Sequence, residues 1–308
     1  MMENKKYTLF HIEGGVGKHI MSTAVVKAYK HENKDRDIII VCAWPEIFLN
    51  NPDVYKIFKI GNVPHFYKDY IYNKDIEIFA HEPYKETSHI CKHDHLINTW
   101  CNLVNVSSEE ATTDITCNFR EQEDALKLIN NPAGKPILII QPFGGPDRAH
   151  SITTTNNQPH EYSWMRDIHP LIIQQVVNVM QDKYHIIHIC HDTHPHLQHV
   201  QRIDQILPKK VLISMLLFAE KRLLIDSSLQ HAAAALNLPS VVVWVATHPH
   251  VFGYNMHINI EPKTHYPEGT VDSYLYDYSF TGLSHECMYS TPSEIHDPET
   301  IIKALTID

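Results

Sequence analysis

Residues 223–235 read LLIDSSLQHAAAA: an apolar run ends in Asp226-Ser227-Ser228, and an alanine-rich stretch follows. The apolar run predicts a buried strand, and Asp and Ser are favourable residues at the start of a helix. Alanines let such a helix lie close to a sheet or to a ligand. A second apolar run, 240–246, follows and predicts a strand in the middle of a sheet.

The same alternation of strands and helices fills both halves of the chain. It predicts strands at 7–12, 37–43, 54–60 and 77–80, then at 136–141, 185–190, 222–225 and 240–246. The pattern indicates an α/β fold with two Rossmann-like, doubly wound parallel-sheet domains that face a cleft. Because such sheets bind ligands beyond the carboxyl ends of their strands, this cleft is the expected site.

A proline- and glycine-containing stretch, Asn131-Pro132-Ala133-Gly134-Lys135-Pro136, is the best candidate for a linker. We therefore expect one domain at 1–133 and a second at 134–308. A last helix is predicted over 298–305 and is a candidate to pack back on the first domain.

Composition restricts the partners. Among 308 residues, Lys and Arg total 26 and Asp and Glu total 36, which gives a net charge of -10. An acidic chain without a basic run has little general attraction for nucleic acid, so we expect no nucleic-acid partner. Any phosphate that binds must be held by local geometry.

The cellular location is expected to be the cytoplasm. The apolar stretch Tyr7–Ile12 is too short for a signal peptide, and no segment approaches the ~20 apolar residues that span a bilayer. The six cysteines form no CxxC pair, which favours free thiols in a reducing compartment.

Histidine is abundant, with 24 residues, and six of them fall at 185, 188, 191, 194, 196 and 199. Metal binding must be considered for such a stretch. However, these histidines would scatter over a strand, a turn and a helix, and no HExxH or paired Cys/His signature is present. We therefore expect solvated or capping histidines and no metal.

A glycine-rich turn, Ile12-Glu13-Gly14-Gly15-Val16-Gly17-Lys18, joins the first strand to the first helix and uses three of the ten glycines. Such a turn lets the backbone approach a ligand, and the helix offers free N–H groups to an anion. A P-loop would need Gly at position 12 and Ser or Thr at 19, where Ile12 and His19 stand. A dinucleotide fingerprint fails at Ile20. A tight turn without a ligand remains the alternative.

The helix that starts at Ser228 is the second candidate anion site. Its N-terminus would attract a diphosphate through free N–H groups and the helix dipole. Capping by Asp226, Ser227 and Ser228 is the purely structural alternative.

The Asp226-Ser227-Ser228-x-x-His231 motif and the alanines after it resemble the donor-site motif of family 9 glycosyltransferases, which are heptosyltransferase-like enzymes. Weaker similarities to the same family occur elsewhere in the chain. They are found at 14–17, at Gln141-Pro142-Phe143-Gly144-Gly145 and at 162–170, whereas the stretch up to Gly253 belongs to the more specific match that begins at Asp226.

The resemblance implies a GT-B fold and inverting transfer of a heptose-like or hexose sugar, without a metal or other cofactor. The nucleotide-diphosphate sugar donor would bind the second domain. The acceptor, a glycan of lipopolysaccharide type, would bind near the first domain and bring the protein close to a membrane surface. The donor contacts would be Gly144, Gly145, Arg166 as the cation, Asp226, Ser227, Ser228, His231 and Thr247. His231 would donate to a phosphate or a sugar hydroxyl, or would bond to a neighbouring loop.

Two positions depart from the family pattern. The acceptor-side loop comprises Gly14, Gly15, Gly17 and Lys18, and Lys18 stands where the family usually has its Asp base. An ammonium is not a base unless it is strongly desolvated, so another carboxylate is needed. Glu13 is the first candidate and Glu82 the second. Ser228 also replaces a family glycine.

Two alternatives to transfer follow from these departures. A catalytically degenerate protein would bind a nucleotide-sugar without turnover, and Lys18 favours it. A nucleotide-sugar epimerase shares the two-domain architecture and would need no acceptor.

Overall fold

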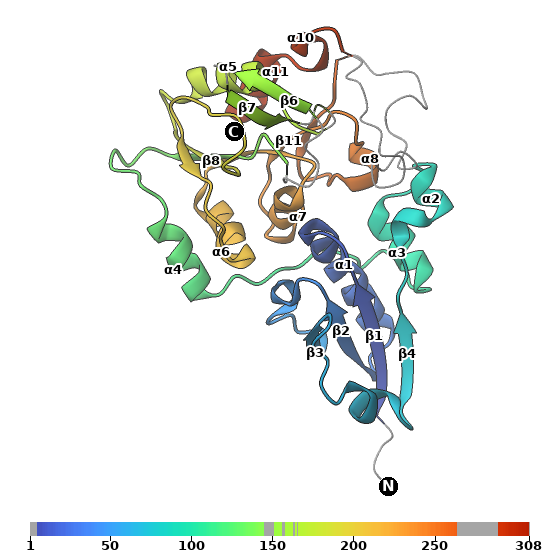
Figure 1. Cartoon of the computed structure of the whole chain (residues 1–308). Helices are drawn as coiled ribbons and strands as arrows, with labels where there is room; N and C mark the ends of the chain where they lie inside the picture. The colour runs from blue at the N-terminus through green and yellow to red at the C-terminus, as the bar shows by residue number, and fades with distance from the viewer. Residues whose placement is uncertain are drawn as a thin grey trace. The chain divides into compact units, whose positions relative to one another are not determined.

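The computed structural model describes residues 5–144, 151–155, 158–162, 164, 166–263 and 289–307. The chain divides into two compact units, Met1–Cys117 and Asn118–Asp308 (Figure 1). Each unit contains its own parallel sheet, as the sequence predicted.

The first unit is built on a four-stranded sheet. Its strands β1 (Lys6–Ile12), β2 (Arg36–Cys42), β3 (Val54–Lys59) and β4 (Asp75–Phe79) lie in the order β3-β2-β1-β4, and every pair is parallel. The chain moves from β1 outward to β3 and then returns to the other side of β1 with β4. The strand order therefore reverses between β1 and β4.

Both faces of this sheet are covered. The helix α1 (Val16–Glu32) packs on one face, where Tyr29 meets Phe10 of β1 edge to face, with ring centroids 5.4 Å apart. On the other face, Tyr70 of the π-helical turn η2 (Tyr67–Ile71) meets Tyr7 and Phe58. Aromatic side chains therefore cover the second face of the sheet, in the place where a longer helix would normally pack. The shorter elements of this unit are η1 (Pro45–Phe48), η3 (Pro83–Lys85), α2 (Thr87–Ile90) and α3 (Leu96–Leu103).

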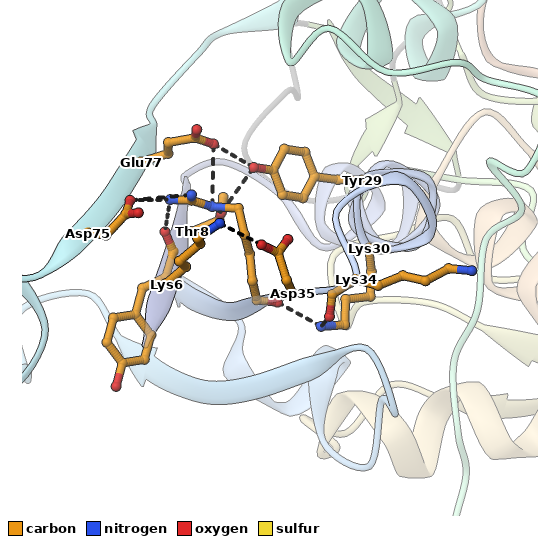
Figure 2. A network of polar contacts seen from close by, with 10 residues as sticks. Lys6, Thr8, Tyr29, Lys30, Lys34, Asp35, Asp75 and Glu77 are labelled. Carbon is orange, nitrogen blue, oxygen red and sulfur yellow. Dashed lines mark hydrogen bonds and ion pairs between the residues drawn. The ribbon is translucent and has the colours of Figure 1, made fainter. Parts of the chain in front are cut away.

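A polar network fastens the amino ends of the strands (Figure 2). Arg36 is buried; its Nε donates to Thr8 Oγ1 at 2.8 Å, and its guanidinium pairs with Asp75 and Glu77. The Tyr29 hydroxyl donates to Glu77 Oε2 at 2.5 Å, and burial raises the pKa of Tyr29 to about 12. These contacts tie β1, β2 and β4 together near their amino ends, and sheets of this kind bind ligands at the opposite, carboxyl ends of their strands.

The second unit has a six-stranded parallel sheet in the order β12-β11-β10-β5-β8-β9. Its strands are β5 (Ile137–Ile140), β8 (His185–Ile189), β9 (Gln201–Ile203), β10 (Lys221–Ile225), β11 (Val241–Val243) and β12 (Ile258–Ile260). In chain order this is the 3-2-1-4-5-6 arrangement of a Rossmann sheet, and the order reverses between β5 and β10. A separate antiparallel hairpin is formed by β6 (Ser151–Thr155) and β7 (Gln158–Tyr162), a region for which the sequence predicted no strand.

The helices of the second unit account for where the two units divide. They are α4 (Phe119–Lys127), α5 (Pro170–Met180), α6 (Lys209–Ser214), η5 (Met215–Phe218), α7 (Ser228–Ala235), α8 (Pro249–Phe252), α10 (Pro292–Ile295) and α11 (Pro298–Thr306). Because α4 packs against α6 and η5, the units divide at Cys117 and Asn118, ahead of the expected linker at 131–136.

The last helix, α11, lies within the second unit. It lies against α5, β10 and β11, and it contributes Ile301, Ala304 and Leu305 to that unit's core. Its three apolar residues recur at helical spacing, which gives it one buried face. Within the described residues, no helix combines the length and the apolar character needed to cross a bilayer.

Candidate functional site

Each sheet has one switch point, where crossovers leave neighbouring strands on opposite sides and a crevice opens at their carboxyl ends. In the first unit β1 runs into Glu13, and β4 is followed closely by Glu82. In the second unit β5 runs into Gln141, and β10 runs into Asp226. Three residues proposed from the sequence, Glu13, Glu82 and Asp226, therefore lie at these two strand edges.

The two strand ends of the second unit are tied together. Gln141 Nε2 donates to Ser227 Oγ at 3.1 Å, across the switch point. The backbone N–H of Gly144 donates to Asp167 Oδ1 at 2.8 Å, and Asp167 is buried. Sequence reasoning missed Gln141 and Asp167 as separate contributors, although Gln141 could have been found as the first polar residue after a strand.

Arg166 and Asp226 form the charged pair of this edge. Asp226 is buried, and its Oδ2 lies 3.8 Å from Arg166 Nε, which is too long for a hydrogen bond. Arg166 Nη1 also lies 3.5 Å from the Asp226 carbonyl oxygen. The sequence proposed both residues as donor contacts, and the fold brings them together.

Three buried oxygen atoms at this edge lack a hydrogen-bond partner within the described part of the chain. They are Gln141 Oε1, Asp226 Oδ2 and Thr247 Oγ1, which follow β5, β10 and β11. Buried polar atoms in native proteins are rarely unpaired. The first two atoms accept hydrogen bonds, so the group that satisfies them must carry hydroxyl or amino protons.

The start of α7 is free of side-chain capping. Among described helices of eight residues or more, α3, α4, α5 and α11 are capped by His95, Asn118, His169 and Asp297, whereas α1 and α7 have no side-chain cap. The structural alternative, in which side chains of Asp226, Ser227 and Ser228 cap α7, is therefore not observed. Ser227 Oγ bonds to Gln141 instead. Both helices without a side-chain cap begin at a switch point, where their N–H groups suit an anion.

His231 is held by the protein itself. It is buried one turn into α7, and its Nδ1 lies 3.0 Å from the Tyr254 hydroxyl. The preceding Gln230 donates to the Phe252 carbonyl at 3.0 Å. These bonds fasten the loop after α8 to α7, so His231 takes the neighbouring-loop role that the sequence left open. Tyr254 was not anticipated.

The histidine-rich stretch supports the Gly144 loop. His188 of β8 and His194 pack on Phe143, with ring centroids 5.6 and 5.5 Å away. Burial lowers the pKa of His188 to about 3. Burial is also the main cause that lowers the pKa of His194 to about 4, although a hydrogen bond to the Gly144 backbone acts in the opposite direction. Both rings are therefore neutral at pH 7. In the described residues, no three His, Cys, Asp or Glu side chains assemble as a metal site.

The glycine turn of the first unit is anchored from below. His19 is fully buried; its Nε2 accepts from Ala43 N at 3.2 Å, so its Nδ1 carries the proton that bonds the Gly15 carbonyl at 2.8 Å. Gly14 has φ +95°, and a Cβ there would lie 3.3 Å from Lys18 Cδ. A Cβ on Gly15 would meet nothing within 4 Å. The turn therefore leaves open space at the start of α1, and Gly17 lies inside the first turn of that helix.

Lys18 points inward and does not belong to an open loop. Its Nζ lies 2.6 Å from Glu82 Oε2 and 5.6 Å from the ring centroids of both Tyr84 and Trp100. Glu82 remains 37% exposed, and the other candidate base, Glu13, is 68% exposed with His11 Nε2 at 3.7 Å. Both carboxylates lie at the carboxyl edge of the sheet, but they are held very differently. Gly145, the remaining predicted contact, lies outside the described residues.

Several solved structures that are similar to this chain are glycosyltransferases. A family 9 glycosyl transferase from Veillonella parvula gives a TM-score of 0.67 at 11% sequence identity. The similarity covers 99% of this chain and 97% of the Veillonella chain. The chain has the fold of family 9 glycosyltransferases. The ADP-heptose LPS heptosyltransferase II of E. coli gives 0.63 at 12% identity over 97% and 98%. The E. coli heptosyltransferase WaaC, solved with ADP, gives 0.52 at 13% identity over 82% and 92%.

The family 9 fold is therefore confirmed by structure, where the sequence motifs had indicated it. The sequence itself matches no protein-family model and no curated protein. At such low identity the site residues must be argued from this chain's own geometry.

Proposed function

We propose that the protein is an inverting glycosyltransferase. It moves a heptose-like or hexose sugar from a nucleotide-diphosphate donor to a glycan acceptor of lipopolysaccharide type. The observation that carries the proposal is the buried Oδ2 of Asp226, which has no hydrogen-bond partner in the described structure and lies beside Arg166 at the uncapped start of α7.

The second unit offers complementary groups to the two parts of a nucleotide-sugar. The Arg166 guanidinium and the first N–H groups of α7 suit a diphosphate, which is anionic and accepts hydrogen bonds. Gln141 Oε1 and Asp226 Oδ2 accept hydrogen bonds, and Thr247 Oγ1 can also do so; these groups suit ribose or sugar hydroxyls. No metal is needed, because the cation and the helix dipole act on the same phosphates.

The same groups would favour the reaction. As the bond between the anomeric carbon and the diphosphate breaks, negative charge grows on the leaving oxygen. A fixed guanidinium and helix N–H groups stabilise that charge more in the transition state than in the bound donor. Displacement in one step by an acceptor hydroxyl inverts the anomeric carbon, and the acceptor proton passes to a carboxylate of the first unit.

Similar structures support an ADP-type donor. The WaaC structures contain ADP and ADP-2-deoxy-2-fluoro heptose. We place the protein in the cytoplasm, near a membrane surface through its acceptor. None of the five cysteines that the structure describes forms a disulfide, which suits a reducing compartment.

The donor site is tested by thermal unfolding with ADP, GDP, UDP and their sugar conjugates. We expect at least one nucleotide to raise the Tm by several degrees, because a ligand that binds only the folded state stabilises it. Asp226→Ala and His231→Ala should weaken the shift, the first by removing a contact and the second by loosening α7 from the Tyr254 loop. Arg120→Met, an exposed change in α4, should leave it unchanged.

Two results would contradict the proposal. If the Asp226 and His231 variants show the same Tm shift as the wild type, the nucleotide binds elsewhere. If no nucleotide shifts the Tm of the wild type, donor binding is excluded. Incubation with donor alone, followed by product analysis, separates transfer from epimerisation, since an epimerase converts the donor without an acceptor. Binding without turnover would favour the degenerate protein, although Glu13 and Glu82 both stand at the edge where a base is needed.

A further inference from the structure

We propose that Glu82 is the catalytic base and that Lys18 is its positioning residue, an inference that rests on the proposed glycosyl transfer. The two residues meet at the switch point of the first sheet. Lys18 lies in the first turn of α1, which follows β1, and Glu82 comes shortly after β4. The pair therefore occupies the edge at which this fold holds its ligands.

The carboxylate of Glu82 is held at both oxygens. Oε2 accepts from Lys18 Nζ at 2.6 Å, and Oε1 accepts from the backbone N–H of Tyr84 at 3.4 Å. The side chain nevertheless remains partly exposed, so an acceptor hydroxyl can reach it. A base works when it is fixed within hydrogen-bond reach of the proton that it takes.

Lys18 is unusual because its charged side chain is buried at the carboxyl edge of the sheet, where solvent exposure is expected. Its Nζ lies over the rings of both Tyr84 and Trp100 as well as against Glu82. A buried ammonium is strongly disfavoured without a counter-ion, so it restricts the Glu82 carboxylate to one place. The ring faces add attraction for the cation and hold it in turn.

Glu13 lacks such a frame. It is largely exposed, and among the described contacts its carboxylate has only His11, with the nitrogen and oxygen 3.7 Å apart. An exposed side chain of this kind samples many rotamers, whereas transfer needs one position. The geometry therefore selects Glu82.

Transfer moves one proton and exchanges one bond at the anomeric carbon. The acceptor hydroxyl gives its proton to a Glu82 carboxylate oxygen while its oxygen bonds to the anomeric carbon. The bond from that carbon to the diphosphate oxygen breaks, and its electron pair leaves with the nucleoside diphosphate. Protonated Glu82 then releases the proton to water.

The test measures steady-state release of nucleoside diphosphate from the donor that gives the largest thermal shift, with water as the acceptor. Glu82→Gln should lower kcat by about a hundredfold, the usual contribution of general-base catalysis, with little change in KM. Formate should restore part of the turnover of Glu82→Ala, which a purely structural residue would not show. Lys18→Met should lower kcat by roughly tenfold at unchanged KM, and Lys18→Arg should recover part of the loss.

Glu86→Gln is the matched control, since it removes the same charge four positions along the chain, and its turnover should remain within about twofold of wild type. Circular dichroism and the nucleotide-induced Tm shift establish that each variant is folded and binds donor. Wild-type-like turnover in Glu82→Gln, or loss of turnover in Glu13→Gln alone, would overturn the assignment while donor binding stands. Absence of any nucleotide shift would remove both this inference and the proposed function.

Discussion

The two switch points carry ion pairs of opposite polarity. In the first unit the cation is buried and the carboxylate is more accessible, since Lys18 is 7% and Glu82 37% exposed. In the second unit the carboxylate is buried and the cation is more accessible, since Asp226 is 6% and Arg166 25% exposed. One topology therefore presents a carboxylate at one edge and a guanidinium at the other. Glycosyl transfer requires both kinds of group, a proton acceptor for the incoming hydroxyl and a cation for the leaving diphosphate.

The pairs also differ in closure. Lys18 and Glu82 are in direct contact at 2.6 Å, whereas Arg166 and Asp226 stand 3.8 Å apart and Asp226 Oδ2 is unpaired. The first pair is complete as folded, which suits a residue that must stay in position. The second pair is open, which suits a site that a ligand completes.

The largest expected loss of stability comes from removing the cation of the second pair. Arg166→Met should destabilise the protein by about 3 kcal/mol, because it leaves the buried Asp226 carboxylate without a cation. Asp226→Asn should cost less, since it removes the buried charge itself. Urea unfolding followed by circular dichroism measures both. Equal losses would mean that the Asp226 charge is balanced by something other than Arg166.

Opposite polarity predicts the reverse asymmetry in the first unit. Glu82→Gln should cost about 2 kcal/mol by leaving the buried Lys18 ammonium with only its aromatic neighbours. Lys18→Met should cost less than ~1 kcal/mol, because the half-exposed Glu82 carboxylate can turn into water. The same unfolding experiment compares them. A larger loss in Lys18→Met would show that the carboxylate, not the cation, is the dependent member.

Adjacent glycines in the first turn provide a smaller, matched pair of changes. Gly14→Ala should destabilise by roughly 1–2 kcal/mol, because φ +95° is unfavourable for a residue with a Cβ and Lys18 Cδ lies 3.3 Å away. Gly15→Ala should change stability by less than ~0.5 kcal/mol, since its Cβ would enter open space. Thermal unfolding without ligand checks both. A similar cost at the two positions would indicate that the space in front of α1 is closed.

A last prediction concerns His188, the histidine that packs under the Gly144 loop. Both ring nitrogens of His188 are buried without hydrogen bonds in the described structure, so His188→Leu should stabilise by about 1 kcal/mol. Burial lowers the pKa of His188 from 6.5 to about 3. Between these values the unfolded chain binds more protons, so the wild type loses stability as pH falls from 6.5 toward 3.

The Leu variant lacks this loss, and its advantage should therefore grow between pH 7 and pH 5. Urea titrations at the two pH values measure the change. A constant difference would mean that His188 is protonated in the folded state or that the acid sensitivity lies elsewhere.

Much of the fold could be read from local patterns. The buried strands β2, β5, β10 and β11 are continuous apolar runs, and such runs predict strands covered on both faces. The motif at 226–231 and the glycine turn at 14–17 each mark a strand-to-helix junction. The sequence alone therefore determined two parallel α/β sheets and the segments that end at their ligand edges, because strand and helix periodicity depend on neighbouring residues.

Only the tertiary structure decided which residues meet at those edges. Lys18 and Glu82 are 64 positions apart, and Arg166 and Asp226 are 60 apart. Their pairing depends on β4 lying beside β1 and β5 beside β10, and strand order leaves no trace in local periodicity. The sequence also assigned Lys18 to the acceptor-side loop and left side-chain capping of α7 as an alternative, because propensity describes a residue's preference and not its partner. Burial then determined which member of each charged pair remains available to a ligand.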